Sequence, residues 1–368
     1  MKKEKYKVGI IGATGMVGQR FITLLADHPW YDVVVLAASP RSAGKSYKDA
    51  VGSKWCMDID IPQNIAEMTV LNATDDVEKI AGLVDFVFCA VDMKKDEIKA
   101  LEERYAKAEC PVVSNNSAHR HTADVPMIIP EINPEHLDII PAQRERLGTK
   151  RGFIAVKSNC SLQSYLPAMA VINEKYPISR ALVTTYQAIS GAGKTFDTWP
   201  EMVDNLIPYI GGEEMKSEVE PNKILGKIDG KEIVPSDALA IECQTYRVPV
   251  SNGHTAAIFF SFKDGVNKPS VEEIEKMWKE FKGEPQTLKL PHAPEQFLYV
   301  YSESDAPDQP QIKTAREIDG GMAISCGRLR ESTQYDYKMV SMSHNTLRGA
   351  AGGAVLLAEL LTAKGWMD

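Results

Sequence analysis

Six cysteines stand at positions 56, 89, 110, 160, 243 and 326, and one of them has a setting that suits catalysis. Cys160 lies in the segment KSNCS (157–161), after a short apolar run and before a stretch with helical spacing. The positive end of a helix dipole favours the thiolate, which is the form that attacks a carbonyl carbon. We therefore predict that Cys160 is a nucleophile. Cys89, inside a hydrophobic run, is better explained as a core residue.

A cysteine nucleophile needs an acid/base partner, and the chain contains seven histidines. His254 stands in the segment NGHT (252–255) between two β-rich stretches, where the glycine lets the backbone turn and present the imidazole to a cleft. His119 and His121 flank Arg120 and fit ordinary loop positions equally well. The residue types alone favour His254 without deciding for it, because a lone histidine is more often structural than catalytic.

A glycine-rich turn near the N-terminus, VGIIGATGMVG (8–18), directly follows a predicted strand and directly precedes a predicted helix. In that position glycines permit a tight turn and close approach of the backbone to a pyrophosphate, and the helix N-terminus attracts the anion. The spacing is GxxGxxG, not GxGxxG, and the alternative is a strand-to-helix turn without a ligand. The predicted cofactor contacts are Gly12, Thr14, Gly15, Met16 and Val17.

The second predicted strand lacks the acid that selects NAD. An NAD site usually places Asp or Glu after this strand, where the carboxylate accepts from the ribose 2'-hydroxyl. Here the strand runs into ASPRSAGK (38–45), so the groups offered are those of Ser39, Arg41 and Ser42. An ordinary solvated loop with one arginine is the alternative. Together with the glycine turn, the hydroxyl and cationic groups favour the 2'-phosphate of NADP.

Two predicted domains, each indicated by its own pattern of strands and helices, must position these candidate residues. Up to about residue 155, apolar strands (7–11, 33–38, 84–91, 111–114) alternate with helical stretches (17–26, 94–106), which predicts an α/β, doubly wound (Rossmann-type) dinucleotide-binding domain. Later β-rich stretches (180–188, 240–250, 254–262) with few helices predict an α+β domain with a partly antiparallel sheet. We expect the NADP-binding domain at 1–156 and the catalytic domain at 157–344. A helix at 347–363, within the terminal segment 345–368, would return to the first domain.

Composition excludes several classes of protein. The 368 residues are 44% hydrophobic and 25% charged, which is globular usage and enough for two domains. A formal charge of -8 disfavours nucleic-acid binding. The cysteines lack C-x-x-C spacing, so neither a disulfide framework nor a metal site is predicted. With no signal peptide and no apolar run of roughly 18 residues, we expect a cytoplasmic protein without membrane contact.

Five motifs, in this order, resemble those of aspartate-semialdehyde dehydrogenases: GATGMVG (12–18), SNCS (158–161), YQAISGAGK (186–194), EEMK with NKIL (213–225) and RVPVSNGHT (247–255). The resemblance covers nearly the whole chain and, through SNNSAHR (114–120), is closest to the archaeal and fungal branch. It implies NADP-dependent reductive dephosphorylation of 4-phospho-L-aspartate to L-aspartate 4-semialdehyde in lysine, methionine and threonine biosynthesis. It also implies a homodimer or homotetramer built through the second domain.

The same resemblance implies roles for individual residues. Cys160 would be the nucleophile, His254 the acid/base, and Gln187 the residue that orients the acyl intermediate. Arg247, on the same β stretch as His254, would hold the substrate carboxylate, and Glu213 would face its ammonium group. The remaining implied contacts are to phosphate, from Arg120, Asn159 and Lys216, and to the cofactor, from Ser190, Gly191, Gly193 and Asn345.

The spacing of Arg247 and His254 poses a geometric problem. They are seven positions apart, and this odd offset puts them on opposite faces of an ideal strand. A turn or bulge at 251–253 must re-aim the imidazole if both side chains line one cleft.

Other functions remain open on the sequence. Malonyl-CoA reductase and N-acetyl-glutamyl-phosphate reductase would use the same cysteine, histidine and NADP. The i, i+3 spacing of Glu213 and Lys216 also describes a solvated helical pair, but the two side chains favour a substrate with an amino group and a transferable phosphate. A non-catalytic NADP-sensing protein would have no need for Cys160 and His254 together.

Overall fold

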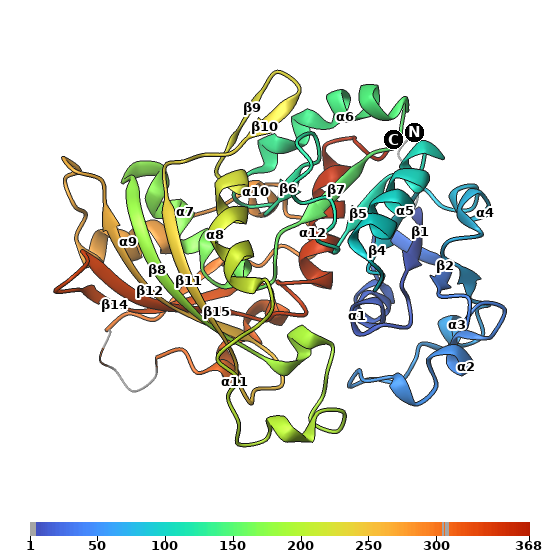
Figure 1. Cartoon of the computed structure of the whole chain (residues 1–368), viewed down its shortest axis with the longest axis horizontal. Coiled ribbons are helices and arrows are strands. Elements are labelled where there is room, and N and C mark those ends of the chain that lie inside the picture. The colour runs from blue at the N-terminus through green and yellow to red at the C-terminus, as the bar shows by residue number, and fades with distance from the viewer. Residues whose placement is uncertain (1–4, 304, 306–308) are drawn as a thin grey trace.

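The computed structural model describes residues 5–303, 305 and 309–368, and it contains two large β-sheets (Figure 1). The first sheet has seven parallel strands in the order β3-β2-β1-β4-β5-β7-β6. The strand order reverses between β1 and β4, and ligands of doubly wound folds bind at this switch point. The strands are β1 (Tyr6–Ile11), β2 (Tyr31–Ala38), β3 (Leu71–Asn72), β4 (Phe86–Cys89), β5 (Val112–Ser114), β6 (Met127–Ile128) and β7 (Ile154–Lys157).

Helices cover both faces of this sheet, because successive side chains of a strand point to opposite faces. Ile10 packs into a core shared with α1 and α12, whereas Ile11 packs into the core that includes α4 and α5. Figure 1 shows the C-terminal helix α12, in red, beside β5 and β7, and it also contacts α1. The helices are α1 (Met16–Leu25), α2 (Tyr47–Val51), α3 (Gln63–Ala66), α4 (Val77–Ala81), α5 (Lys95–Lys107), α6 (Ile140–Leu147) and α12 (Ala351–Ala363).

The second sheet has six strands in the order β11-β8-β12-β15-β14-β13. Two pairs, β8 with β11 and β13 with β14, are parallel, and the other neighbours are antiparallel. Both predicted fold classes are therefore confirmed. The strands are β8 (Ile178–Gln187), β11 (Ala240–Arg247), β12 (His254–Phe262), β13 (Leu298–Val300), β14 (Ile324–Glu331) and β15 (Tyr337–Ser343), and a separate ribbon pairs β9 (Lys227–Asp229) with β10 (Glu232–Val234).

One face of the second sheet is buried and the other is only partly covered. Along β12, Ile258 and Phe260 are buried, whereas the alternating Ala257 and Phe259 remain part-exposed. Trp278 of α9 belongs to the buried side, where its indole nitrogen donates to the Ala168 carbonyl at 2.9 Å. The helices of this part are α7 (Leu166–Lys175), α8 (Glu213–Ile224), α9 (Val271–Glu280), α10 (Glu284–Leu288) and α11 (Ile312–Ala315), and short 3-10 helices are η1 (Gly52–Lys54), η2 (Pro134–Ile139), η3 (Leu162–Ser164), η4 (Ile189–Ala192), η5 (Pro200–Met202) and η6 (Ile318–Gly321).

The terminal helix begins later than the sequence predicts. It starts at Ala351 rather than at Leu347, because the His344 Nδ1 atom accepts the backbone N–H groups of Thr346 and Leu347 and holds this segment in a turn. Within the described part of the chain, no helix combines the length and the apolar character needed to cross a membrane.

Candidate active site

Cys160 sits in a turn at the carboxyl end of β7, and the side chain of Asn159 fixes that turn. The Asn159 Oδ1 atom accepts hydrogen bonds from the Ser161 backbone N–H and hydroxyl, both at 2.7 Å. The helical stretch that follows is split, because Tyr165, at φ -140°, separates the three-residue η3 from α7. Cys160 therefore directly precedes a single 3-10 turn, and the predicted helical stretch continues as α7 only after the break at Tyr165.

The Cys160 thiol faces His254, with 3.4 Å between Sγ and Nε2. On the other side of the ring, Nδ1 accepts the Ala188 backbone N–H at 3.1 Å, so the neutral imidazole carries its proton on Nε2, facing the sulfur. Burial, with a further contribution from the Arg247 charge, lowers the pKa of His254 to about 3. The imidazole is therefore neutral at physiological pH.

The thiol is neutral as well. Burial, together with the negative charge of Glu213, raises the pKa of Cys160 above its ordinary value. The cations Lys157, Arg120 and Lys216 oppose this rise without cancelling it. The predicted stabilisation of a thiolate is therefore wrong for this state of the protein, because burial outweighs the surrounding positive charge.

Three side chains converge because their strands are neighbours in the second sheet. Gln187, at the end of β8, pairs in register with Arg247 of β11 on one side and with His254 of β12 on the other. Residues in register on adjacent strands point to the same face. The prediction that Arg247 and His254 share one β stretch is wrong, since Pro249 lies just beyond the end of β11 and cannot donate to a ladder. The chain between β11 and β12 crosses over β8, so the two residues lie on separate strands on either side of Gln187. No bulge is needed to bring them to one face.

The backbone of η4 passes directly over this trio. A Cβ atom on Gly191 would lie 2.8 Å from Nη1 of Arg247 and 3.1 Å from the His254 ring, so only glycine fits there without displacement. The same Nη1 atom donates to the Ala188 carbonyl at 2.6 Å. Asn345 ties the segment in place, because it donates to the Ser190 hydroxyl at 2.9 Å and accepts the Gly253 N–H at 2.7 Å.

Helix α8 supplies a buried polar stripe at positions spaced by one or two turns. Glu213 accepts from Lys216 at 2.5 Å, from the Asn159 amide at 3.0 Å and from Gln187 at 3.4 Å. Burial opposes its ionisation, but these donors hold the pKa of Glu213 below its ordinary value, so the carboxylate is charged. Two turns further along, Glu220 accepts from Arg120 and from the Asn159 backbone, both at 3.0 Å.

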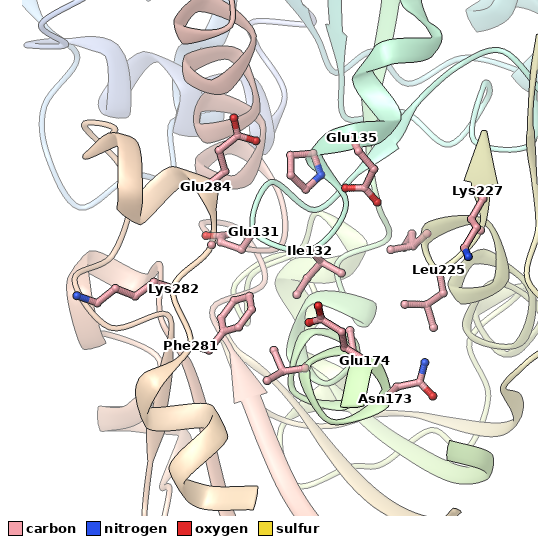
Figure 2. A pocket seen from close by; sticks show the side chains of 16 residues that line it. Glu131, Ile132, Glu135, Asn173, Glu174, Leu225, Lys227, Phe281, Lys282 and Glu284 are labelled. Carbon is pink, nitrogen blue, oxygen red and sulfur yellow. The ribbon is translucent and has the colours of Figure 1, made fainter. Parts of the chain in front are cut away.

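A cavity of about 380 Å³ connects Cys160 with the glycine turn. Gln187, Arg247 and His254 lie behind its wall, and Gly193, with φ of +67°, lies beyond η4 outside the lining. A larger cavity of about 790 Å³, drawn in Figure 2 around Glu131, Glu174 and Phe281, contains none of the predicted site residues. The predicted residues that line the smaller cavity are Val17, Arg120, Asn159, Cys160, Ser190, Gly191, Glu213, Lys216 and Asn345.

The glycine turn has the shape of a dinucleotide cradle. Gly12 has φ of +95°, and a Cβ atom there would meet the Ala90 carbonyl at 2.3 Å, while a Cβ atom on Gly18 would meet the Gly12 carbonyl at the same distance. Gly15 caps α1, with Met16 and Val17 as its first residues after Thr14 in the turn. The backbone at the helix N-terminus is therefore open to a pyrophosphate.

The loop after β2 leaves its donors free for a ligand. The Ser42 backbone N–H donates to the Ser39 carbonyl at 2.9 Å and closes a turn that exposes Arg41. Among the described residues, no carboxylate pairs with Arg41. In the cavity itself, the Asn115 amide is buried and has no partner among the described residues, which fits a polar ligand at that point.

Comparisons with known proteins agree with this architecture. Residues 7–140 match the family model described as semialdehyde dehydrogenase, NAD binding domain, and residues 169–348 match the semialdehyde dehydrogenase dimerisation domain. The aspartate-semialdehyde dehydrogenase of Schizosaccharomyces pombe is 40% identical over 366 residues, which cover 98% of this chain and 99% of the relative. This chain belongs to the aspartate-semialdehyde dehydrogenase family. The Methanothermobacter thermautotrophicus relative is also 40% identical, over 96% of this chain and 98% of its own length.

A solved structure supports the same assignment for the whole chain. Aspartate semialdehyde dehydrogenase with NADP from Candida albicans superposes with a TM-score of 0.87 at 38% identity, over 98% of this chain and 99% of that one. The predicted resemblance to the archaeal and fungal branch is confirmed by these relatives.

Sequence reasoning missed several residues of this family member. Lys157 lines the cavity and is buried, and the signal was a lysine ending the apolar run 153–156. Glu220 was not predicted, although it lies seven residues after Glu213 on the same helix face. Lys223 continues the stripe, because its ammonium donates to three backbone carbonyls of the loop that carries Arg120.

Proposed function

We propose that this chain catalyses the NADPH-dependent reductive dephosphorylation of 4-phospho-L-aspartate to L-aspartate 4-semialdehyde, and the reverse reaction. The observation that carries the proposal is the contact of 3.4 Å between Cys160 Sγ, which lines a cavity ringed by cations, and His254 Nε2, which lies behind the cavity wall. The S. pombe relative that matches over 99% of its length bears the name of this activity. The reaction serves lysine, methionine and threonine biosynthesis.

The chemistry starts at the Cys160 sulfur. As the sulfur attacks the acyl carbon of the substrate, the S–H bond breaks and the thiol proton passes to the departing phosphate. The bond from that carbon to the phosphate oxygen also breaks, and phosphate leaves with the bonding electrons. The His254 Nε2–H group donates toward the sulfur while the thiolate forms and then toward the substrate oxygen on which charge develops. The product of this half-reaction is a thioester on Cys160, which Gln187 holds in place from the adjacent strand. NADPH, when bound, supplies the hydride that reduces the thioester to the aldehyde.

The charged groups of the site match the charges of the substrate. Arg247 is buried, and no carboxylate among the described residues pairs with it, so its guanidinium is free to hold the substrate α-carboxylate in a bidentate pair. The ionised Glu213 faces the substrate ammonium. Arg120, Lys216 and the turn at Asn159 form the phosphate side of the cavity.

The cofactor is NADP, and the chain offers groups for each of its parts. Ser39, Arg41 and Ser42 hold the 2'-phosphate beyond β2, and the turn from Gly12 to Val17 holds the pyrophosphate. The nicotinamide side lies along Ser190, Gly191, Gly193 and Asn345 of the second domain and the terminal segment.

We infer that two copies of the chain pair through the part-exposed face of the second sheet. On that face Tyr186 of β8 is 36% exposed and its ring stacks on Tyr246 of β11 at 5.8 Å between centroids. Phe259 lies on the same face of the adjacent β12. Large apolar patches of this kind mark protein interfaces. A homodimer is expected in sedimentation experiments, and a monomer at micromolar concentration would contradict the pairing.

The test of the function is steady-state turnover with purified protein. We expect reduction of NADP in the presence of L-aspartate 4-semialdehyde and inorganic phosphate, and little reaction with malonyl-CoA and NADPH. A higher kcat/KM with malonyl-CoA, or with N-acetyl-glutamyl phosphate, would replace the proposal with one of those reductases. NADP binding without turnover of any of these substrates would indicate a sensing protein.

A further inference from the structure

Four cations interact electrostatically with Cys160. They are Lys157, Arg120, Lys216 and Arg247. Two of them already have a carboxylate partner. Arg120 pairs with Glu220 at 3.0 Å, and Lys216 pairs with Glu213 at 2.5 Å. For Arg247 and Lys157, the described part of the chain supplies no carboxylate. The site therefore has two cations that no described carboxylate neutralises, and both are available to bind an anion.

Lys157 is the more unusual of these two cations. It is the last residue of β7, it is only 3% exposed, and it lines the cavity that contains Cys160. Arg247 at least donates to the Ala188 carbonyl, whereas the Lys157 ammonium makes neither a hydrogen bond nor an ion pair with any described residue. Burying an ammonium group without a partner is costly, so such a residue persists where it serves a ligand.

The proposed substrate carries two anionic groups, and the site offers two unpaired cations. Arg247 stands near His254 on the second sheet and takes the carboxylate. Lys157 ends a strand of the first sheet, lines the cavity together with Arg120, and is near enough to feel the Arg120 charge. We propose that Lys157 is a phosphate-binding residue, whose ammonium pairs with the phosphate group as it leaves the acyl carbon attached to Cys160. This inference rests on the proposed function and adds a specific cation to its phosphate site.

The electrostatics of Lys157 give this role a distinct signature. Burial, with the neighbouring Arg120 charge, lowers the pKa of Lys157 to about 7. An anion bound beside the amine raises that pKa again, so phosphate binding at pH 7.5 must draw a proton from solution. A lysine that only packs against the strand would take up no proton on phosphate binding.

The experiment compares three variants with the wild-type enzyme. Lys157→Met removes the charge and keeps an unbranched apolar chain in the buried position. Lys157→Arg keeps a cation that stays protonated at every accessible pH. Lys99→Met is the matched control, because Lys99 is exposed on α5 and is not among the residues that line the cavity. Steady-state kinetics give KM separately for phosphate, semialdehyde and NADP, and calorimetry in two buffers of different ionisation enthalpy counts the protons taken up with inorganic phosphate.

For Lys157→Met we expect KM for phosphate to rise about tenfold or more, with KM for semialdehyde and NADP within about twofold of wild type. Lys99→Met should match the wild type. In Lys157→Arg, the proton uptake beyond that of phosphate itself should disappear. The inference would be overturned by an unchanged KM for phosphate in Lys157→Met, by an equal rise of that KM in Lys99→Met, or by a similar rise of all three KM values in Lys157→Met.

The two proposals fail in different ways. A wild-type enzyme that does not turn over semialdehyde and phosphate contradicts the proposed function. In that case calorimetry with inorganic phosphate still decides the role of Lys157, because proton uptake that is equal in the wild type and in Lys157→Arg would exclude it.

Discussion

At the scale of single residues, the Cys160 thiol is neutral in the free protein. Burial and the Glu213 carboxylate keep the pKa of Cys160 raised, and the His254 ring presents an N–H to the sulfur. A substrate ammonium group beside Glu213 would offset the negative charge that opposes the thiolate. In the proposed function, substrate binding and activation of the thiol are thus coupled through one carboxylate.

This coupling predicts a pH effect of Glu213→Gln. A negative charge beside a thiol raises its pKa, so removing that charge lowers the pKa of Cys160 and lets the thiolate form at lower pH. The rate of Cys160 alkylation by iodoacetamide, measured against pH in the free enzyme, should shift to lower pH. Glu214→Gln on the same helix is the control, because that carboxylate accepts from the Thr245 backbone instead. A profile that stays in place or moves to higher pH would refute the coupling.

Replacing Arg247 tests the carboxylate site. Arg247→Leu should raise KM for the semialdehyde and lower kcat/KM by roughly a hundredfold, as expected when a bidentate partner is lost. Arg180→Leu, at the opposite end of the neighbouring strand β8, should leave the kinetics unchanged. Normal kinetics in Arg247→Leu would show that another cation holds the carboxylate.

At the scale of elements, strand register and one helix assemble the site. The ends of β8, β11 and β12 align Gln187 with its two neighbours, and α8 packs against β11 and presents its polar stripe to the turn of Cys160. The short helix η4 then lies so close to Arg247 and His254 that a side chain at Gly191 would not fit.

The close approach of η4 predicts the effect of Gly191→Ala. The added methyl group would contact both Arg247 and His254, and because both are buried and hydrogen-bonded, at least one must move. We expect kcat/KM for the semialdehyde to fall by about tenfold or more, with the melting temperature little changed. Gly82→Ala is the control, since a Cβ atom there makes only ordinary contacts at 3.5 Å. Full activity in Gly191→Ala would show that the site tolerates this displacement.

In the proposed function, the loop after β2 determines the preference for NADP over NAD. A charge-assisted pair to a phosphate is worth roughly 1.5 to 3 kcal/mol, which corresponds to a preference of about tenfold to more than a hundredfold for NADP over NAD. Arg41→Ala should narrow that preference, chiefly through a raised KM for NADP. Steady-state kinetics with NADP and with NAD, on the wild type and on Arg41→Ala, measure this preference. Equal use of NADP and NAD by the wild type would contradict the assignment of NADP as the cofactor. If Arg41→Ala keeps the preference for NADP, the 2'-phosphate must be recognised by Ser39, Ser42 or Lys45 instead.

At the scale of the whole molecule, the sequence predicted both sheets, because their strands and the glycine turn leave local patterns. It also named Cys160 and His254, whose Sγ and Nε2 atoms lie 3.4 Å apart in the structure. It placed Arg247 wrongly, because the crossing of β8 by the chain is a long-range pairing that no local spacing reveals. It missed Lys157 and Glu220 for a similar reason, since their importance depends on which distant groups pair with them and which do not.

The molecule brings its two domains together at one cavity, where the first contributes the glycine turn and the second the strand ends and α8. The central claim is that this cavity supports acyl transfer to Cys160. Intact-protein mass spectrometry after mixing with 4-phospho-L-aspartate, without NADPH, tests the claim most directly. We expect the mass of one aspartyl group to appear on the wild type, to map to the peptide containing Cys160, and to disappear on addition of NADPH. An unmodified wild type, or the same adduct on Cys160→Ser, would contradict the account.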